Sequence, residues 1–181
     1  EGLLTENYGE ARRINAGSPE PLWTGGFNTE LSWRGISLGI QLEARYGNKV
    51  LNQDRSLFEA DGSYGDSNIW KGAMNYWKKP GDTNVLPKPV YINSSNSSAI
   101  STRYLEDGSY LRIKDITLAY SLPSKWTKKA LMSGVRIYAS ALNLYTFHNM
   151  NYWDPEHGTS GATIISYPMT RSMIVGVDIT F

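Results

Sequence analysis

Residues 171–181 alternate between apolar and polar side chains, with Ile174 as the one exception. One parity carries the apolar side chains, Met173, Val175, Val177, Ile179 and Phe181. Because successive side chains of a β-strand point to opposite faces, this stretch predicts a strand with one apolar and one polar face. Such a strand either covers the core of a soluble protein or lies in an outer-membrane barrel. In the barrel, one face meets lipid and the other a wet lumen.

Two earlier stretches, residues 22–34 and 36–46, show the same alternation and are joined by Arg34-Gly35, a tight-turn signal. Trp23 and Trp33 close the two ends of the first apolar face. They lie about ten residues apart, which on a tilted strand corresponds to about 25 Å along a barrel axis, the height of an outer-membrane apolar band. The charged side chains of both strands, Glu30, Glu43 and Arg45, share the polar parity. The alternative is that the two tryptophans are core residues of a sandwich.

Three further strands are expected at residues 102–122, 134–147 and 168–181. In the first of these, Leu111 and Ile113 lie on the wrong parity relative to Ile116 and Leu118. We therefore expect a bulge there, or a part of the strand that stands above the bilayer.

Long polar segments separate these strands at residues 47–101 and 148–167. Trp70, Met74 and Trp77 follow helical spacing, which predicts a short helix within residues 68–79. The connector 123–133 is shorter, and we expect one helical turn around residues 126–131. Short connections on one side and long ones on the other are typical of outer-membrane barrels, where the long loops are extracellular.

Composition excludes several classes of protein. The chain has no Cys, so it forms neither disulfides nor thiolate metal sites. Its net charge of +1 gives no reason to expect nucleic acid as a partner. Its apolar runs fall short of the roughly 20 residues that a spanning helix needs, whereas a barrel hides apolar residues by alternation. The chain starts without Met or a signal peptide, which an exported protein would need, so we expect it to be a fragment or a processed piece.

Several blocks of sequence carry a family resemblance. They are Gly17-Ser18-Pro19 leading to Trp23-Thr24-Gly25-Gly26-Phe27, Tyr46-Gly47-Asn48, Arg103 to Lys114 (RYLEDGSYLRIK), Ile116 to Pro123 (ITLAYSLP), Asn143-Leu144-Tyr145-Thr146-Phe147, and Asp154-Pro155-Glu156. Together they resemble the carboxy-terminal portion of SusC/RagA-type TonB-linked outer-membrane transporters of the Bacteroidetes. The block from Asp107 to Arg112 is the most specific part. Gly176, Ile179 and Phe181 are similar to the terminal signal that the barrel-assembly machinery recognises.

The resemblance implies an all-β fold: an antiparallel up-and-down meander forming the last five or so strands of a large transmembrane barrel. Residues 1–181 would then be the carboxy-terminal part of a TonB-dependent receptor in the cell outer membrane, without its plug and TonB box. Relatives of this kind work with a SusD-like lipoprotein and the TonB system, and they import oligosaccharides or peptides. The resemblance thus implies nutrient uptake rather than an enzyme, with membrane lipid and the assembly machinery as further partners.

Aromatic side chains of the long segments are the candidate ligand contacts: Trp70, Tyr76, Trp77, Tyr152 and Trp153. Flat rings suit the C–H faces of sugars, but they also pack loops together. We find no catalytic constellation and expect no cofactor. A metal site from His148 and His157 near Asp154 has no supporting spacing. Lys128-Lys129 is either a solvated pair or a contact to lipid headgroups.

Two alternatives remain open at this point. The first is a soluble β-sandwich carbohydrate-binding module, whose apolar faces would pack on each other. The second is an outer-membrane enzyme barrel, which needs a nucleophile and a base near its rim. Convergence of Trp23, Leu38, Val177 and Phe181 into one dry interior would favour the sandwich.

Overall fold

The computed structural model describes residues 5, 7–65, 68–83, 85–94, 96–156, 161–163, 167 and 169–181. The chain divides into two compact units. The sheet unit comprises residues 20–48, 107–156 and 167–181, and the loop unit comprises residues 1–19, 49–106 and 157–166. Each unit is described by itself.

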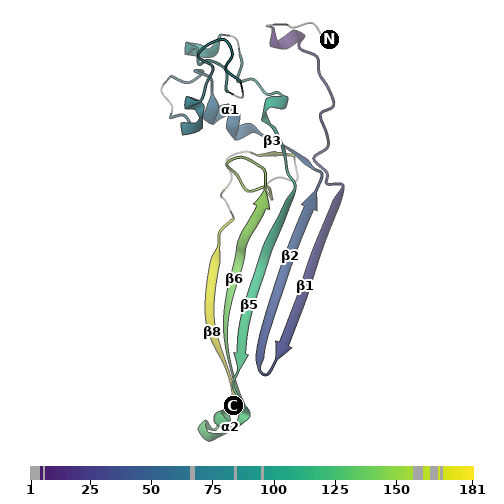
Figure 1. Cartoon of the computed structure of the whole chain (residues 1–181), viewed down its shortest axis with the longest axis vertical. Coiled ribbons are helices and arrows are strands. Elements are labelled where there is room, and N and C mark those ends of the chain that lie inside the picture. Colours follow the sequence, from purple (N-terminus) through teal and green to yellow (C-terminus); the bar gives the residue numbers. More distant parts are fainter. Residues whose placement is uncertain are drawn as a thin grey trace. The chain divides into compact units, whose positions relative to one another are not determined.

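The sheet unit is one five-stranded sheet in the order β1-β2-β5-β6-β8, with every neighbouring pair antiparallel (Figure 1). Its strands are β1 (Trp23–Trp33), β2 (Ile36–Tyr46), β5 (Tyr110–Ser121), β6 (Gly134–His148) and β8 (Ser172–Thr180). Strands adjacent in this sheet follow one another along the chain. The predicted antiparallel meander of five strands is confirmed.

The short connections of the sheet lie at one end of it. Arg34 and Gly35 both have positive φ, of 50° and 86°, as a two-residue hairpin turn of type I′ requires. The Ser121 amide donates to the Gly35 carbonyl at 2.7 Å, and the Ser133 amide donates to the Thr180 carbonyl at 2.7 Å. The tight turn and the β5–β6 connector therefore lie at the same end of the sheet, as predicted. The helical turn of the connector starts slightly earlier than expected, as α2 (Ser124–Thr127) followed by the 3-10 turn η5 (Lys128–Ala130).

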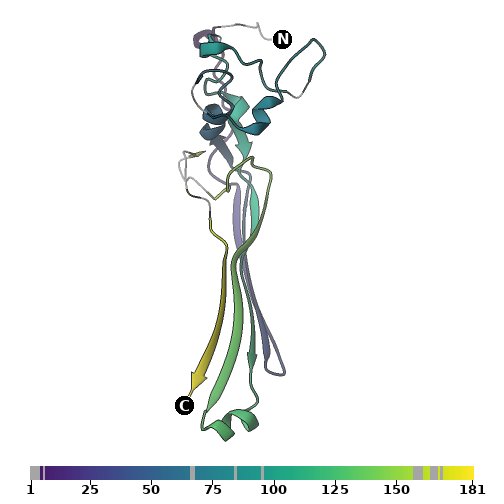
Figure 2. The same ribbon diagram turned by 90° about the vertical axis from the view of Figure 1, so that its left-hand side faces the viewer.

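The apolar parities of neighbouring strands fall on one face of the sheet. β1 and β2 pair residue for residue, with Phe27 opposite Leu42. This face is open: Trp23, Val177 and Phe181 remain 56, 55 and 87% exposed. The described residues of the sheet unit form no second sheet to cover it, and the 90° view shows these strands as a single layer (Figure 2). The sandwich alternative is therefore wrong, because its apolar faces would have to be packed against each other.

A bulge at Lys114 explains the wrong parity of Leu111 and Ile113. β2 passes from Gln41 to Leu42 without a gap, whereas β5 inserts Lys114 between the residues paired with them, Asp115 and Ile113. One extra residue in one strand changes its parity at that point. Leu111 and Ile113 consequently share the apolar face with Ile116, and the expected bulge is confirmed. The register of β5 against β6 shifts at the same place.

The loop unit contains little regular structure. A small sheet has the order β4-β3-β7, formed by β3 (Lys49–Asn52), β4 (Leu105–Asp107) and β7 (Ala162–Thr163). Its helices are α1 (Gln53–Glu59) and the 3-10 turns η1 (Tyr8–Glu10), η2 (Lys71–Met74), η3 (Tyr91–Asn93) and η4 (Thr102–Tyr104).

Two sequence predictions for the long segments need correction. The helix expected within residues 68–79 is only the single turn η2, and Tyr76 instead forms a bridge with Leu86. The strand expected at residues 102–122 is divided into η4, β4 and β5. The side chain of Asp107 accepts from the Ser109 amide at 3.1 Å and from the Ser109 hydroxyl at 2.6 Å, and this local turn interrupts the strand.

Charged side chains form much of the interior of the loop unit. Arg55 is paired with Glu59 and Glu106, both at 2.7 Å, and Arg103 is paired with Glu59 at 3.0 Å and with Asp61. The ring of Tyr104 is fully buried, and the guanidinium groups of Arg55 and Arg103 lie 5.8 and 5.0 Å from its centre. Burial is the largest single influence and lowers the pKa of Arg103, but the hydrogen bond with Asp61 and the negative charges of Asp61 and Glu59 together outweigh it, so the pKa is raised. Of the helices described, none has the length and apolar character needed to cross a membrane.

Candidate functional site

A buried arginine on the polar face of the sheet is the centre of the site. The side chain of Arg112, in β5, has no solvent exposure. It donates to the Thr146 hydroxyl of β6 at 2.8 Å, and it is ion-paired with Asp154 and Glu156. Both carboxylates come from the loop that follows β6. The loop therefore returns over the polar face of the sheet, and Arg112 holds it there.

Lys114, the bulged residue, extends this network to β2. Its ammonium group lies 2.9 Å from Glu43 and 3.1 Å from Glu156. The buried Tyr110 hydroxyl donates to Glu43 at 2.7 Å, and the Arg112 guanidinium lies over the Tyr110 ring at 5.4 Å. We call Glu43, Tyr110, Arg112, Lys114, Thr146, Asp154 and Glu156 the charge clamp. Each of its two cations is paired with two of its three carboxylates, as expected for ions held at a partly buried site.

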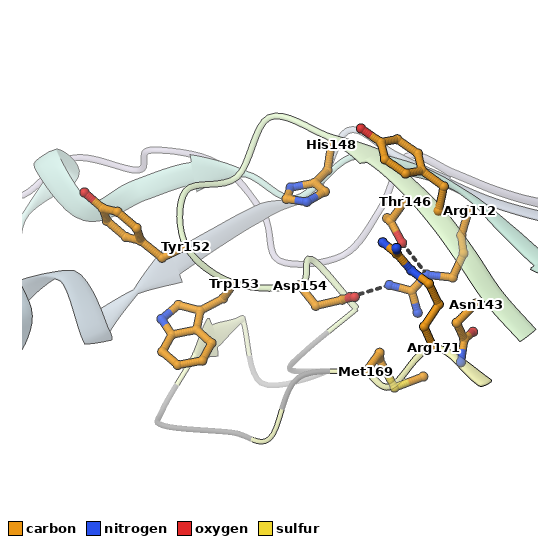
Figure 3. A pocket seen from close by; sticks show the side chains of 10 residues that line it. Arg112, Asn143, Thr146, His148, Tyr152, Trp153, Asp154, Met169 and Arg171 are labelled. Atoms are coloured by element: carbon orange, nitrogen blue, oxygen red, sulfur yellow. Dashed lines mark hydrogen bonds and ion pairs between the residues drawn. The ribbon is translucent and has the colours of Figure 1, made fainter. Parts of the chain in front are cut away.

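A cavity of about 390 Å³ opens beside the clamp (Figure 3). Its lining includes Arg112, Asn143, Thr146, His148, Tyr152, Trp153, Asp154, Met169 and Arg171. The Asn143 side chain donates to the Thr170 carbonyl at 3.2 Å, which ties β6 to the segment before β8. Asn143 has a positive φ of 50°, a conformation that asparagine tolerates better than most residues. Asn143 lies where the pairing of β6 with β5 shifts register, at the same level of the sheet as the Lys114 bulge.

The cavity combines aromatic and cationic side chains. Tyr152 and Trp153 come from the loop after β6, and Arg171 comes from the segment before β8 (Figure 3). Arg171 is exposed, and within the described residues it has no ion-pair partner. Rings stack on sugars and on planar groups, while a solvated guanidinium binds carboxylates or hydroxyls. The arrangement suits binding of a polar organic molecule.

The structure brings together two of the five predicted contact residues, Tyr152 and Trp153. The other three, Trp70, Tyr76 and Trp77, belong to the loop unit. There, Trp70 and Trp77 are exposed, and the Tyr76 ring lies 5.4 Å from the Lys78 ammonium group.

The predicted assembly-signal residues lie on both faces of β8. Ile179 and Phe181 are exposed on the apolar face. Gly176 faces the other side, opposite Tyr138. A Cβ at Gly176 would overlap the Tyr138 ring, so the glycine has a packing role besides any signal.

Metal binding finds no support in the described part of the chain, where no three His, Asp or Glu side chains are grouped so as to hold an ion. Asp154 and Glu156 are instead engaged by Arg112. His157 lies outside the described residues, and His148 lines the cavity.

The sequence analysis missed the charge clamp. A signal for it was present, because Arg112 and Lys114 shared parity with apolar residues, and charges at such positions need partners. The acidic pair Asp154 and Glu156 was a candidate partner at long range. The sequence alone did not show that Arg112 pairs with Asp154 and Glu156, because only the bulge at Lys114 puts Arg112 on the polar face.

Comparison with known proteins identifies relatives of the whole chain. It is 30% identical to TonB-dependent receptor P3 and 27% identical to TonB-dependent receptor P26, both of Formosa agariphila, over 94 and 91% of the chain. The fold matches the structure of the RagAB peptide transporter with a TM-score of 0.79 and 30% identity over 91% of the chain. The RagAB importer in its open-open state matches with a TM-score of 0.74 and 28% identity. No protein-family model matches the chain.

Over this length the chain is similar in sequence and in fold to TonB-dependent receptors of the SusC/RagA type. It spans only about a sixth of its relatives, 17% of receptor P3 and 18% of the matched RagAB chain. Its sheet is a segment of a receptor β-barrel. Two of the sequence blocks that carry the resemblance meet physically, including the most specific one. The block from Asp107 to Arg112 supplies the clamp arginine, and Asp154-Pro155-Glu156 supplies its two carboxylates.

Proposed function

We propose that this chain is the carboxy-terminal part of the barrel of an outer-membrane TonB-dependent importer. The importer takes up oligosaccharides or peptides together with a SusD-like lipoprotein. The observation that carries the proposal is the two-faced sheet, whose apolar face is open while its opposite face holds a network of paired charges. An apolar exterior and a polar lumen are the two environments that such a wall separates.

Aromatic residues at both ends of the apolar face support the membrane assignment. Trp23 and Tyr46 form one cross-strand pair, with Phe147 at the same end, and all three are exposed. Trp33 and Phe181 are exposed at the opposite end. Rows of aromatic residues at two levels are typical of membrane barrels, where they lie at the two interfaces with water.

The sheet also requires further strands. Five strands do not close a barrel, since the smallest common membrane barrels have about eight. Within the described residues, β1 and β8 are the edges of the sheet. The relatives are about six times longer than this chain and have room for the remaining strands, a plug and a TonB box.

The cavity beside the charge clamp is the proposed cargo contact within this segment. Tyr152 and Trp153 supply flat faces for stacking, and Arg171 supplies a solvated cation. In RagAB the cargo is a peptide, as the name of that transporter states. Both sugars and peptides suit a site of this composition, so cargo of either class belongs to the proposal.

Single-cysteine spin labelling of the full-length receptor tests the membrane assignment, and the absence of Cys from this segment makes each label unique there. Labels at Leu38 and Ile40 are expected to be accessible to oxygen dissolved in lipid. Labels at Gln41 and Glu43 are expected to be accessible to a water-soluble nickel complex. Equal accessibility of the two parities would contradict the barrel wall.

Uptake by cells tests transport. Cells that carry the receptor and its neighbouring lipoprotein are given fluorescein-labelled casein peptides or a labelled polysaccharide hydrolysate. Uptake of one probe is expected to require the receptor and to stop with a protonophore, because the TonB system is energised. Trp153→Ala is expected to lower uptake several-fold, whereas Tyr91→Ala, at an exposed loop aromatic, serves as the matched control. Uptake that persists without the receptor would overturn the proposal.

A further inference from the structure

The β5–β6 connector carries a cluster of cations to which the proposed function assigns no role. Lys128 and Lys129 lie three and four residues after Lys125, which places the three side chains on one side of a helical turn. Throughout the described residues, none of the three ammonium groups is ion-paired. α2 lies beyond the end of β5 and β6 in both views (Figures 1 and 2).

Large apolar side chains accompany these lysines. Trp126 is 60% exposed and Leu131 is 89% exposed, whereas Thr127 is the buried anchor of the connector. Leu131 adopts a left-handed conformation with φ of 58°, in which a bulky residue is strained. Within the described structure little contact with protein offsets that strain. Lysine, tryptophan and leucine together are the composition of a segment that lies in a membrane interface.

An apolar groove on the apolar face of the sheet begins next to the connector. It has a volume of about 640 Å³ and is lined mainly by Ile36, Leu118, Tyr120, Ile137, Ala139 and Val175. The groove exists because Ala139 is small between larger neighbours on β5 and β8, Leu118 and Val175. Tyr120 and Ile137 are paired close to the point where β5 and β6 enter the connector.

We propose that the groove and the connector together form a binding site for one anionic phospholipid. An acyl chain lies in the groove, and the phosphate of the headgroup is bound by Lys125, Lys128 and Lys129. This proposal depends on the proposed function, in which the sheet lies in the outer membrane. Charge complementarity selects the occupant, because three unpaired cations adjoin an apolar groove with almost no polar lining. Basic residues near a membrane surface favour the binding of anionic lipid, and their effects accumulate.

Native mass spectrometry of the full-length receptor tests this site. The receptor is purified in detergent, delipidated, and mixed with equal amounts of dioleoyl phosphatidylglycerol and dioleoyl phosphatidylcholine. Retention of phosphatidylglycerol is expected to exceed that of phosphatidylcholine by about tenfold or more, given three basic residues. The triple variant Lys125→Gln, Lys128→Gln, Lys129→Gln is expected to abolish that preference.

Two further variants make the result specific. The triple variant Lys71→Gln, Lys78→Gln, Lys79→Gln removes the same charge from the loop unit and is expected to keep the preference. Ala139→Phe fills the groove from its lipid side and is expected to lower retention of phosphatidylglycerol without removing any lysine. Equal retention of the two lipids by the wild type, or an unchanged preference in the connector variant, would overturn the lipid site.

The same preparations separate this failure from failure of the barrel itself. Heat-modifiable migration in electrophoresis and recovery in the outer-membrane fraction report on the barrel. A receptor that passes both tests but shows no lipid preference contradicts only the lipid site. A receptor recovered outside the membrane contradicts the proposed function.

Discussion

The guanidinium of Arg112 and the carboxylate of Glu156 form an ion pair that connects β5 to the loop after β6, although 44 positions separate the two residues in sequence. Arg112 is fully buried, whereas Glu156 is about a quarter exposed. The partially exposed loop is thus attached to the sheet through a group that water does not reach.

Arg112→Met is expected to release this loop. The substitution leaves Asp154 and Glu156 without their main partner, and breaking a buried pair in this way costs about 3–5 kcal/mol. Hydrogen exchange of residues 149–156 in the full-length receptor should become much faster, while exchange in β1 stays slow.

Arg136→Met is the matched control for that experiment. Arg136 is paired with Asp178 at 3.2 Å, but both side chains are exposed, so the substitution should lower the free energy of unfolding by about 1 kcal/mol or less. If the two variants gave equal exchange in residues 149–156, Arg112 would not be holding the loop.

Deletion of Lys114 is expected to be tolerated better than deletion of Thr117. Removing the bulged residue leaves Asp115 and Ile113 on the faces they already occupy. Removing Thr117 from the regular part of the strand moves the side chains on one side of the deletion to the opposite face. Arg112 would then face lipid, which costs about 2–4 kcal/mol of stability. Heat-modifiable folding of the full-length receptor is the measurement. Equal failure of both deletions would show that the bulge itself is required.

Much of the sheet was predictable because its two faces meet different media. The alternation in residues 36–46 and 171–181 fixes both the strands and the faces, and the Arg34-Gly35 turn fixes their direction. The bulge was foreseen from the misplaced parity of Leu111 and Ile113, but its position at Lys114 required the partner strand. A single sequence does not show which residue of a strand is left unpaired by its neighbouring strand.

The loop segments were predictable only in part, because their interior depends on long-range pairs of charges. α1 was missed, since its buried residues are Asp54 and Glu59 rather than a stripe of apolar side chains. The helical spacing of Trp70, Met74 and Trp77 suggested a helix that proved to be a single turn. Of the five aromatic candidates, only Tyr152 and Trp153 could be placed at a common cavity.

Tyr104 is expected to make the loop unit sensitive to alkali. Burial raises the pKa of Tyr104 to about 12, above the ordinary value near 10. A raised pKa in the folded state means that stability is complete below pH 10 and is lost as pH rises through about 12. The loss amounts to about 1–3 kcal/mol. The protection factors of residues 49–63, which correct hydrogen exchange for its intrinsic base catalysis, should therefore fall over that range.

Tyr104→Phe provides the control. The buried hydroxyl has no hydrogen-bond partner in the described structure, so its removal costs little and leaves the ring beside Arg55 and Arg103. The variant is expected to match the wild type at neutral pH and to resist alkali better. An unchanged alkaline response would assign the sensitivity to another group.

Gly176→Ala is expected to impair folding because of Tyr138 rather than through loss of a recognition signal. The new methyl group would overlap the Tyr138 ring, and overpacking of this kind costs about 1–3 kcal/mol. The double variant Gly176→Ala, Tyr138→Ala removes the overlap and should recover most of the lost stability in urea titrations of the full-length receptor. Assembly in cells should recover in parallel. If the double variant folded well in vitro but still failed to assemble in cells, Gly176 would belong to the signal together with Ile179 and Phe181. Removal of Phe181, which is 87% exposed, supplies the reference for a signal defect.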